Sequence, residues 1–137
     1  MAMKVIFDCN IWISFLIGHH AKLIQQILTD SRFNILVCEE LLEEIHDVSS
    51  RSKIQCRVSE EELDEMFSII HAFCDKVTIE RNARVNIRDP KDLYLLSLAE
   101  TVDADFVVTG DADLLDLKGH KRTRIITFAE FKELFGR

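Results

Sequence analysis

The chain has 137 residues, which fits one domain around a single apolar core. With 47% hydrophobic and 30% charged residues, one proline and four glycines, it is neither a disordered linker nor a collagen-like chain. Its formal net charge of −7 disfavours a protein that coats nucleic acid by electrostatic attraction alone. The charge still allows an enzyme that gathers carboxylates around cations.

Apolar residues alternate between strand and helix patterns along the chain. In order, they predict a strand at 4–8, a helix at 21–28, a strand at 34–38, helices at 39–48 and 59–73, a strand at 76–79, a helix opened by Asp89 and Pro90, strands at 105–109 and 124–127, and a last helix. Capping boxes mark the starts of the 59–73 helix and the last helix. We therefore expect one α/β domain over residues 1–137, with a mostly parallel five-stranded sheet covered on both faces.

Targeting segments and disulfides are not expected. Asp8 interrupts the early apolar stretch and no small-residue cleavage site follows, so a signal peptide is disfavoured. The apolar run at 11–17 is too short to span a membrane. Four widely spaced cysteines without a CxxC pair predict reduced thiols instead of a zinc site: Cys9, Cys38, Cys56 and Cys74. A cytoplasmic protein without membrane contact is the expectation.

Three acidic residues follow predicted strands, where the ligand site of a parallel sheet lies. Asp8 ends the first strand, Asp111 lies just beyond the fourth, and Asp113 follows two residues later. Asp111 and Asp113 could instead belong to a turn that caps a short helix. Asp8 ends a buried strand with no Lys or Arg beside it in sequence, so its carboxylate must be paired, protonated or metal-bound.

Helical phase selects Glu44 among the acids of the 39–48 helix. It falls about 90° from the centre of the buried face, which is formed by Leu41, Leu42, Ile45 and Val48. Glu40 lies further round and Glu43 points to solvent. Many helices carry such a border glutamate without any function. In the helix that Pro90 opens, Asp89 is a natural N-cap and Asp92 suits the third position, so the residues alone favour capping for both.

Clustered carboxylates require cations or raised pKa values. Two carboxylates about 5 Å apart repel by roughly 3 kcal/mol at an effective dielectric near 20. Their oxygens suit Mg²⁺ or Mn²⁺, and metal-assisted attack of water on a phosphodiester is the natural reaction. Replacing Asp111 by Asn should then stabilise the metal-free protein. Other chemistries fit less well, because the sequence has no GxxxxGK[ST], GxGxxG or GxSxG motif and no zinc pattern among its five histidines.

Two groups of basic residues could contact phosphates. The first follows the acidic turn and contains Lys121, Arg122 and Arg124. The second consists of Arg51, Lys53 and Arg57. A solvated charged loop is the commoner role of such groups.

Four motifs, in this order and spacing, resemble those of the PIN-domain nucleases: FDCN at 7–10, LLEEI at 41–45, RDPKD at 88–92 and VVTGDADLL at 107–115. The resemblance spans nearly the whole chain, from Lys4 to about Phe131. The last two motifs are most similar to those of prokaryotic PIN proteins described as toxins of toxin–antitoxin pairs. The resemblance implies a three-layer α/β/α sandwich and a metal-dependent endoribonuclease.

Carried over position by position, the resemblance implies five site acids: Asp8, Glu44, Asp92, Asp111 and Asp113. They would hold one or two Mg²⁺ or Mn²⁺ ions, directly or through water, for attack by activated water without a covalent intermediate. Asp92 is thereby reassigned from capping to the site, while Asp89 remains a cap. Asn10 and Thr109 would orient carboxylates or the water. Cys9 stands where the family commonly has Thr, which removes a hydroxyl but no acid.

The resemblance also implies partners. RNA would be the substrate, and single-stranded RNA fits best because the scissile phosphate must reach a recessed pocket. A separately encoded antitoxin and a homodimer are further expectations. The alternative is a catalytically silent PIN-like module that binds RNA or protein, which the intact acid set disfavours. A structure-specific DNA nuclease is disfavoured because the chain has no room for long insertions.

Overall fold

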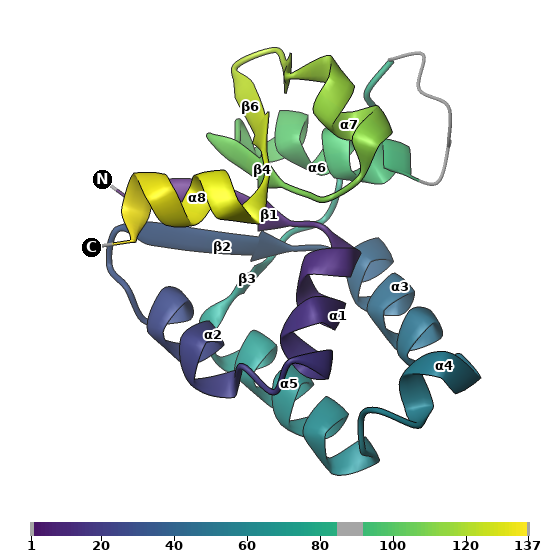
Figure 1. Ribbon diagram of the computed structural model, residues 1–137. Coiled ribbons are helices and arrows are strands. Elements are labelled where there is room, and N and C mark those ends of the chain that lie inside the picture. The colour runs from purple at the N-terminus through teal and green to yellow at the C-terminus, as the bar shows by residue number, and fades with distance from the viewer. Residues whose placement is uncertain (1, 85–91, 137) are drawn as a thin grey trace.

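The computed structural model describes residues 2–84 and 92–136 (Figure 1). Its elements in chain order are β1 (Met3–Phe7), α1 (Cys9–Ile17), α2 (Ala21–Leu28), β2 (Phe33–Val37), α3 (Glu39–Ser49), α4 (Ser52–Gln55), α5 (Glu60–Phe73), β3 (Asp75–Lys76), α6 (Leu93–Val102), β4 (Phe106–Val108), α7 (Ala112–Leu117), β5 (Gly119–His120), β6 (Thr123–Ile126) and α8 (Phe128–Phe135). Within these described ranges, no helix has the length and apolar character needed to cross a membrane.

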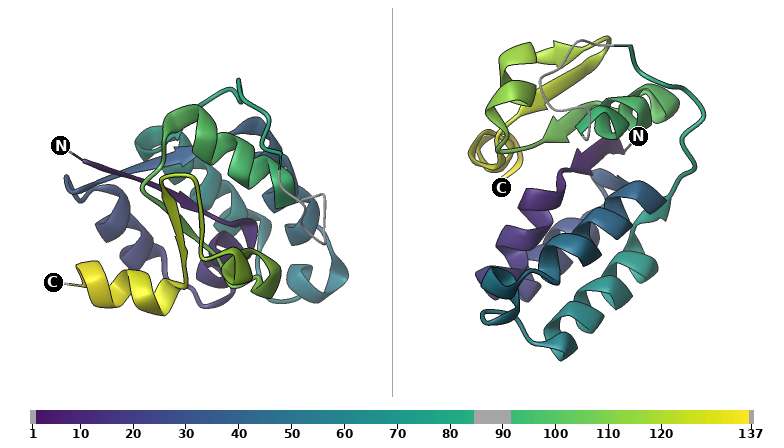
Figure 2. Two further views of the ribbon diagram at one scale, coloured as in Figure 1. Left: turned by 90° about the horizontal axis from the view of Figure 1, so that it is seen from above. Right: turned by 90° about the vertical axis from the view of Figure 1, so that its right-hand side faces the viewer.

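In the described part of the chain, the central sheet has six strands in the order β3-β2-β1-β4-β6-β5. Neighbouring strands run parallel except β5 and β6, which are antiparallel. Helices α1, α2, α3 and α5 lie on one side of β1 and β2, and α6 lies on the other (Figures 1 and 2). The expected α/β fold, with a mostly parallel sheet between helical layers, is confirmed.

The sixth strand corrects the expected count of five. β5 has only two residues and pairs with β6 so that His120 lies opposite Thr123. The turn between them begins at Lys121, whose φ of 54° is left-handed. The hairpin escaped prediction because this turn lacks an Asn-Gly or Asp-Gly pair, and a two-residue strand shows no alternation.

Helix α1 follows β1 directly and was not predicted. It is apolar on nearly every side, so it leaves no amphipathic period in the sequence. Trp12 and Phe15 of this helix pack edge-to-face on Phe7 of β1, with ring centroids 5.6 and 6.0 Å away. Phe131 of α8 packs on the same ring at 5.5 Å. This aromatic cluster fixes the end of β1, and with it the position of Asp8.

The predicted helix boundaries are confirmed where capping chemistry sets them. Both expected capping boxes are present, at the first turns of α5 and α8. β3 is shorter than expected, with two residues at 75–76 instead of four at 76–79. The expected start of α6 at Asp89 and Pro90 lies outside the described residues, and the described helix begins at Leu93.

Candidate active site

A cleft of about 550 Å³ opens at the carboxyl edge of the sheet, where β1 and β4 end side by side. The two strands are in register, with Phe7 beside Val108, so the residues that follow them share one edge. The described residues that line the cleft are Asp8, Cys9, Asn10, Glu40, Glu43, Glu44, Asp47, Val48, Arg51, Asp92, Tyr94 and Asp111. Four of the five acids expected in the site therefore face one cavity.

Asp8 is the buried acid of the cleft, with only 2% of its surface exposed. Its backbone N–H donates to the Val108 carbonyl at 2.9 Å, which continues the β1–β4 pairing by one residue. Burial raises the pKa of the Asp8 carboxyl, and the negative charge of Asp111 adds to the increase. The hydrogen bond from Thr109 opposes the increase without cancelling it. Burial thus makes the negative charge of Asp8 costly.

Thr109 connects the two acids that come from neighbouring strands. Its side chain is fully buried, and its hydroxyl donates to Asp8 Oδ2 at 2.6 Å. The same hydroxyl oxygen accepts the backbone N–H of Asp111 at 3.0 Å. Because one hydroxyl both donates and accepts, it holds the Asp8 carboxylate in a defined orientation relative to the turn after β4. This is the kind of contact expected of a residue that orients a carboxylate.

Asp111 combines a capping role with a place in the cleft. It is the N-cap of α7, and its Oδ1 accepts the backbone N–H of Asp113 at 2.8 Å. A hydrogen bond from the Asp92 carboxyl is the largest influence that lowers the pKa of Asp111. The turn-and-cap interpretation of the sequence is therefore correct, but it does not exclude a role in the cleft. Asp113 supplies its backbone N–H, and its side chain is not among the described residues that line the cavity.

Glu44 reaches the cleft from α3, where its side chain is half-buried. Tyr94 of α6 donates its hydroxyl to Glu44 Oε1 at 3.1 Å. Burial and the nearby charges of Glu44 and Asp8 raise the pKa of Tyr94. Sequence reasoning missed Tyr94, although it is the one tyrosine of the sequence and follows Asp92 by two residues, which was a usable signal.

Cys9 lies at the floor of the cleft, beside the same two acids. It is 2% exposed, and burial followed by the charges of Glu44 and Asp8 raises the pKa of its thiol. The thiol is therefore neutral at ordinary pH and does not act as a nucleophile. Asn10, in the first turn of α1, lies at the exposed part of the lining.

Asp92 stands at the start of α6 without capping it. It precedes Leu93, and its carboxyl makes no hydrogen bond to the amides of the first turn. Its side chain instead lines the cleft, where it is the largest influence that lowers the pKa of Asp111. Asp92 therefore has a place in the cleft beyond the capping role that the residues alone favoured, and the expected helix start at Asp89 and Pro90 lies outside the described residues.

The cleft is strongly acidic, with seven carboxylates among its described lining residues. Glu40 and Glu43 are two of them, although helical phase placed both away from the core. Glu43 is exposed, as its helical phase predicted, and it lines the cleft because the cleft extends past the border of the core onto the exposed side of α3. Arg51 is the one cationic residue among the described lining residues.

The first basic group lies elsewhere. Lys121 pairs with Glu100 at 2.8 Å, and Arg122 pairs with Asp105 at 3.0 Å, just before β4 begins. Arg124 lies over the Phe106 ring with its guanidinium carbon 5.6 Å from the centroid. These contacts place the three basic residues at the amino ends of β4 and β6, which is the edge of the sheet opposite Asp8. They are absent from the described lining of the cleft.

The acids of the cleft fit a hard divalent cation by their donor chemistry. Among the described residues, no three His, Cys, Asp or Glu side chains already stand close enough to enclose a metal ion. The Asp92 side chain is the largest influence that lowers the pKa of Asp111, so the two carboxyls interact within the cleft. A divalent cation bound there would offset the repulsion between neighbouring acids.

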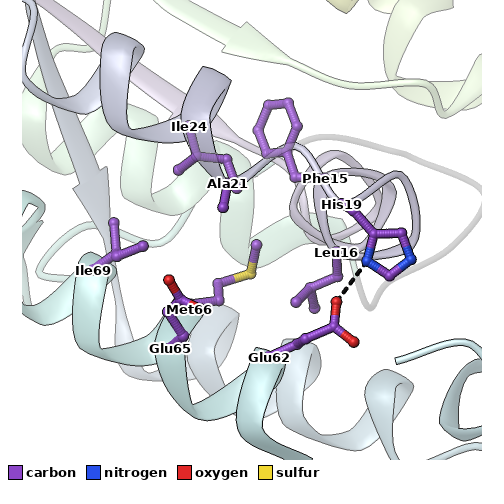
Figure 3. A pocket seen from close by; sticks show the side chains of 9 residues that line it. All are labelled: Phe15, Leu16, His19, Ala21, Ile24, Glu62, Glu65, Met66 and Ile69. Atoms are coloured by element: carbon purple, nitrogen blue, oxygen red, sulfur yellow. Dashed lines mark hydrogen bonds and ion pairs between the residues drawn. The ribbon is translucent and has the colours of Figure 1, made fainter. Parts of the chain in front are cut away.

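A smaller apolar pocket of about 90 Å³ lies between α1, α2 and α5 (Figure 3). Leu16, Ile24 and Met66 are among the residues that line it. At its edge, His19 Nδ1 and Glu62 Oε2 lie 2.6 Å apart. The side chains of this pocket come from the opposite end of α1 to Asp8, so the pocket is separate from the acidic cleft.

Comparisons with known proteins give a family match. The family model described as PIN domain matches residues 4–113. Among solved structures, the T. brucei RRP44 PIN domain is similar, with a TM-score of 0.49 and 14% sequence identity over 97% of this chain and 80% of that chain. A search of curated proteins finds no match.

Proposed function

This chain belongs to the PIN domain family, and we propose on that premise that it is a Mg²⁺- or Mn²⁺-dependent endoribonuclease. The family match supports an enzyme that hydrolyses nucleic acid. RNA as substrate, the divalent ions, and a role as the toxin of a toxin–antitoxin pair are our further proposals. So are a homodimer, a cytoplasmic location, and a single domain over residues 1–137.

The observation that carries the proposal is the convergence of distant acids on one cleft. Asp8, Glu44, Asp92 and Asp111 come from four separate elements and line the same cavity. Asp8 is buried there, and among the described residues its side-chain hydrogen bond comes from the Thr109 hydroxyl and not from a cationic group. Burying a carboxylate in this way destabilises the fold, and such costly groups cluster at functional sites.

The residues would share the work as follows. Asp8, Asp92 and Asp111 would hold the ion or ions, with Glu44 and Asp113 contributing directly or through water. A bound divalent ion supplies positive charge that activates water and offsets the charge of the phosphodiester. Thr109 fixes the orientation of Asp8 through its hydroxyl. Asn10 would orient the attacking water from the exposed part of the lining.

Cleavage of a mixed RNA pool tests the proposal. We expect wild-type protein to cut single-stranded RNA with Mn²⁺, and to stop when EDTA is added. Asp8→Asn should remove the activity, while a surface variant such as Glu133→Gln should keep it. RNA binding without cutting, unchanged by Asp8→Asn, would support the silent binding module and contradict the enzyme.

Arg51 should contact the phosphate backbone of the substrate, because it is the one cation in the described lining of an acidic cleft. Arg51→Gln is expected to raise KM for RNA by about 3- to 10-fold, the effect of one exposed charge, and to leave kcat unchanged. The slope of log binding affinity against log salt concentration should become shallower by about one, as expected when one phosphate contact is lost. Steady-state kinetics at several salt concentrations measure both effects.

Arg57→Gln is the matched control, because Arg57 is an exposed residue of the same basic group outside the described lining. It should leave KM unchanged. Equal effects of the two substitutions would show that general charge, and not a contact in the cleft, attracts the RNA.

A further inference from the structure

We infer that Tyr94 is a positioning residue that sets the orientation of the Glu44 carboxylate for the divalent ion. The inference rests on the proposed function and adds a residue to that site. Tyr94 itself need not touch the ion or the RNA. Its effect passes through the hydrogen bond to Glu44.

The contact joins two elements that are distant in sequence. The hydroxyl of Tyr94 lies 3.1 Å from Glu44 Oε1, and both side chains line the acidic cleft. Tyr94 is on α6, which packs on β1 and β4, whereas Glu44 is on α3, which packs on α1. The hydrogen bond therefore crosses the cleft from one helical layer to the other.

Tyr94 is the more rigid of the two partners. The next two residues of α6, Leu95 and Leu96, are fully buried and anchor that part of the helix. A tyrosine side chain has two torsions, whereas a glutamate has three and loses more freedom when it is fixed. The tyrosine hydroxyl therefore restricts the rotamers that Glu44 samples at the border of the core.

The hydrogen bond is compatible with ion binding. A tyrosine hydroxyl is protonated at neutral pH and has one proton to donate, so it engages one position on Oε1. A carboxylate has about four lone-pair sites, so accepting this proton leaves capacity for a cation.

Mn²⁺ titration calorimetry on purified full-length variants tests the inference without depending on cleavage. Tyr94→Phe removes the hydroxyl and keeps the ring. We expect it to weaken Mn²⁺ binding by about 10-fold or more, as the loss of a ligand-orienting hydrogen bond usually does. In a Glu44→Gln background the same substitution should have no further effect. RNA KM should remain unchanged at saturating Mn²⁺.

Ser97→Ala is the matched control. Ser97 lies one turn further along α6, and its hydroxyl donates to the Leu93 carbonyl and accepts the Ala83 amide, outside the acidic cleft. It should bind Mn²⁺ like wild type, and thermal melts in EDTA should show that both variants are folded.

Three results would overturn the inference. Wild-type Mn²⁺ affinity in Tyr94→Phe would show that the hydroxyl does not position Glu44, and the proposed function would stand. A raised RNA KM with unchanged Mn²⁺ affinity would make Tyr94 a substrate contact. A wild-type protein that neither binds Mn²⁺ nor cuts RNA would contradict the proposed function, and the inference with it.

Discussion

Asp8→Asn should stabilise the metal-free protein while reducing RNA cleavage by at least about 100-fold, because an acid that holds the ion is central to charge stabilisation. Asn keeps the shape of Asp8 and can still accept the Thr109 hydroxyl. It removes a charge that is almost completely buried. We expect a gain of about 1–3 kcal/mol in the free energy of unfolding at neutral pH in EDTA.

The sign follows from the pKa of Asp8. Burial raises this pKa in the folded protein, so the folded state holds the proton more tightly than the unfolded state does. The free energy of unfolding therefore falls as pH rises from the ordinary aspartate pKa through the raised value. Asn has no charge to lose, so the variant should lack this decline. Urea unfolding at several pH values in EDTA measures the difference.

Asp111→Asn is the informative comparison. Hydrogen bonds from Asp92 and from the amides of Asp113 and Leu114 lower the pKa of Asp111, so its charge contributes stability that is lost as pH falls. This variant should lose cleavage without gaining stability. The sequence alone suggested that Asp111→Asn would stabilise the metal-free protein. With the structure, we expect that stabilisation from Asp8→Asn instead. A stability loss for Asp8→Asn at neutral pH would show that its charge is compensated.

Thr109→Val should be the most destabilising change at the site. The side chains have nearly the same shape, but Val offers no hydroxyl to Asp8 Oδ2 and no acceptor to the Asp111 amide. Leaving a buried carboxylate and a backbone N–H without these bonds should cost about 2–5 kcal/mol. Mn²⁺ affinity should fall by about 10- to 100-fold, because Asp8 is no longer oriented.

Thr109→Ser distinguishes the contribution of the Thr109 hydroxyl from that of its methyl group. It retains both hydrogen bonds and loses one buried methyl, so we expect a loss of about 1 kcal/mol and nearly normal Mn²⁺ binding. Denaturant unfolding and calorimetry on the pair give both quantities. If the Val and Ser variants have the same stability and the same Mn²⁺ affinity, packing at position 109 matters and the hydrogen bonds of the Thr109 hydroxyl do not.

The sequence predicted the cleft best where general rules of the fold apply. Asp8 and Asp111 follow parallel strands, and such strands end at one edge of the sheet whatever their loops contain. Glu44 could be selected because α3 is amphipathic, so its phase is readable from the apolar residues. The family resemblance was needed for Asp92, whose local sequence favours capping.

The parts that were missed depend on contacts between distant segments. Tyr94 becomes relevant only because α6 places it opposite Glu44 across the cleft. Lys121, Arg122 and Arg124 follow the acidic turn in sequence, but the β5–β6 hairpin carries them to the other edge of the sheet. No local pattern encodes this reversal, because its turn lacks the usual hairpin residues.

A crystal structure with Mn²⁺, analysed by anomalous scattering at the manganese edge, tests the central claim most directly. The claim is that the acidic cleft holds the divalent ion that cleavage requires. We predict an anomalous peak within coordination distance of carboxylate oxygens of Asp8 and Asp111, which disappears in Asp8→Asn crystals. An empty cleft at Mn²⁺ concentrations that support full RNA cleavage, or a peak only at residues outside the cleft, would contradict the account.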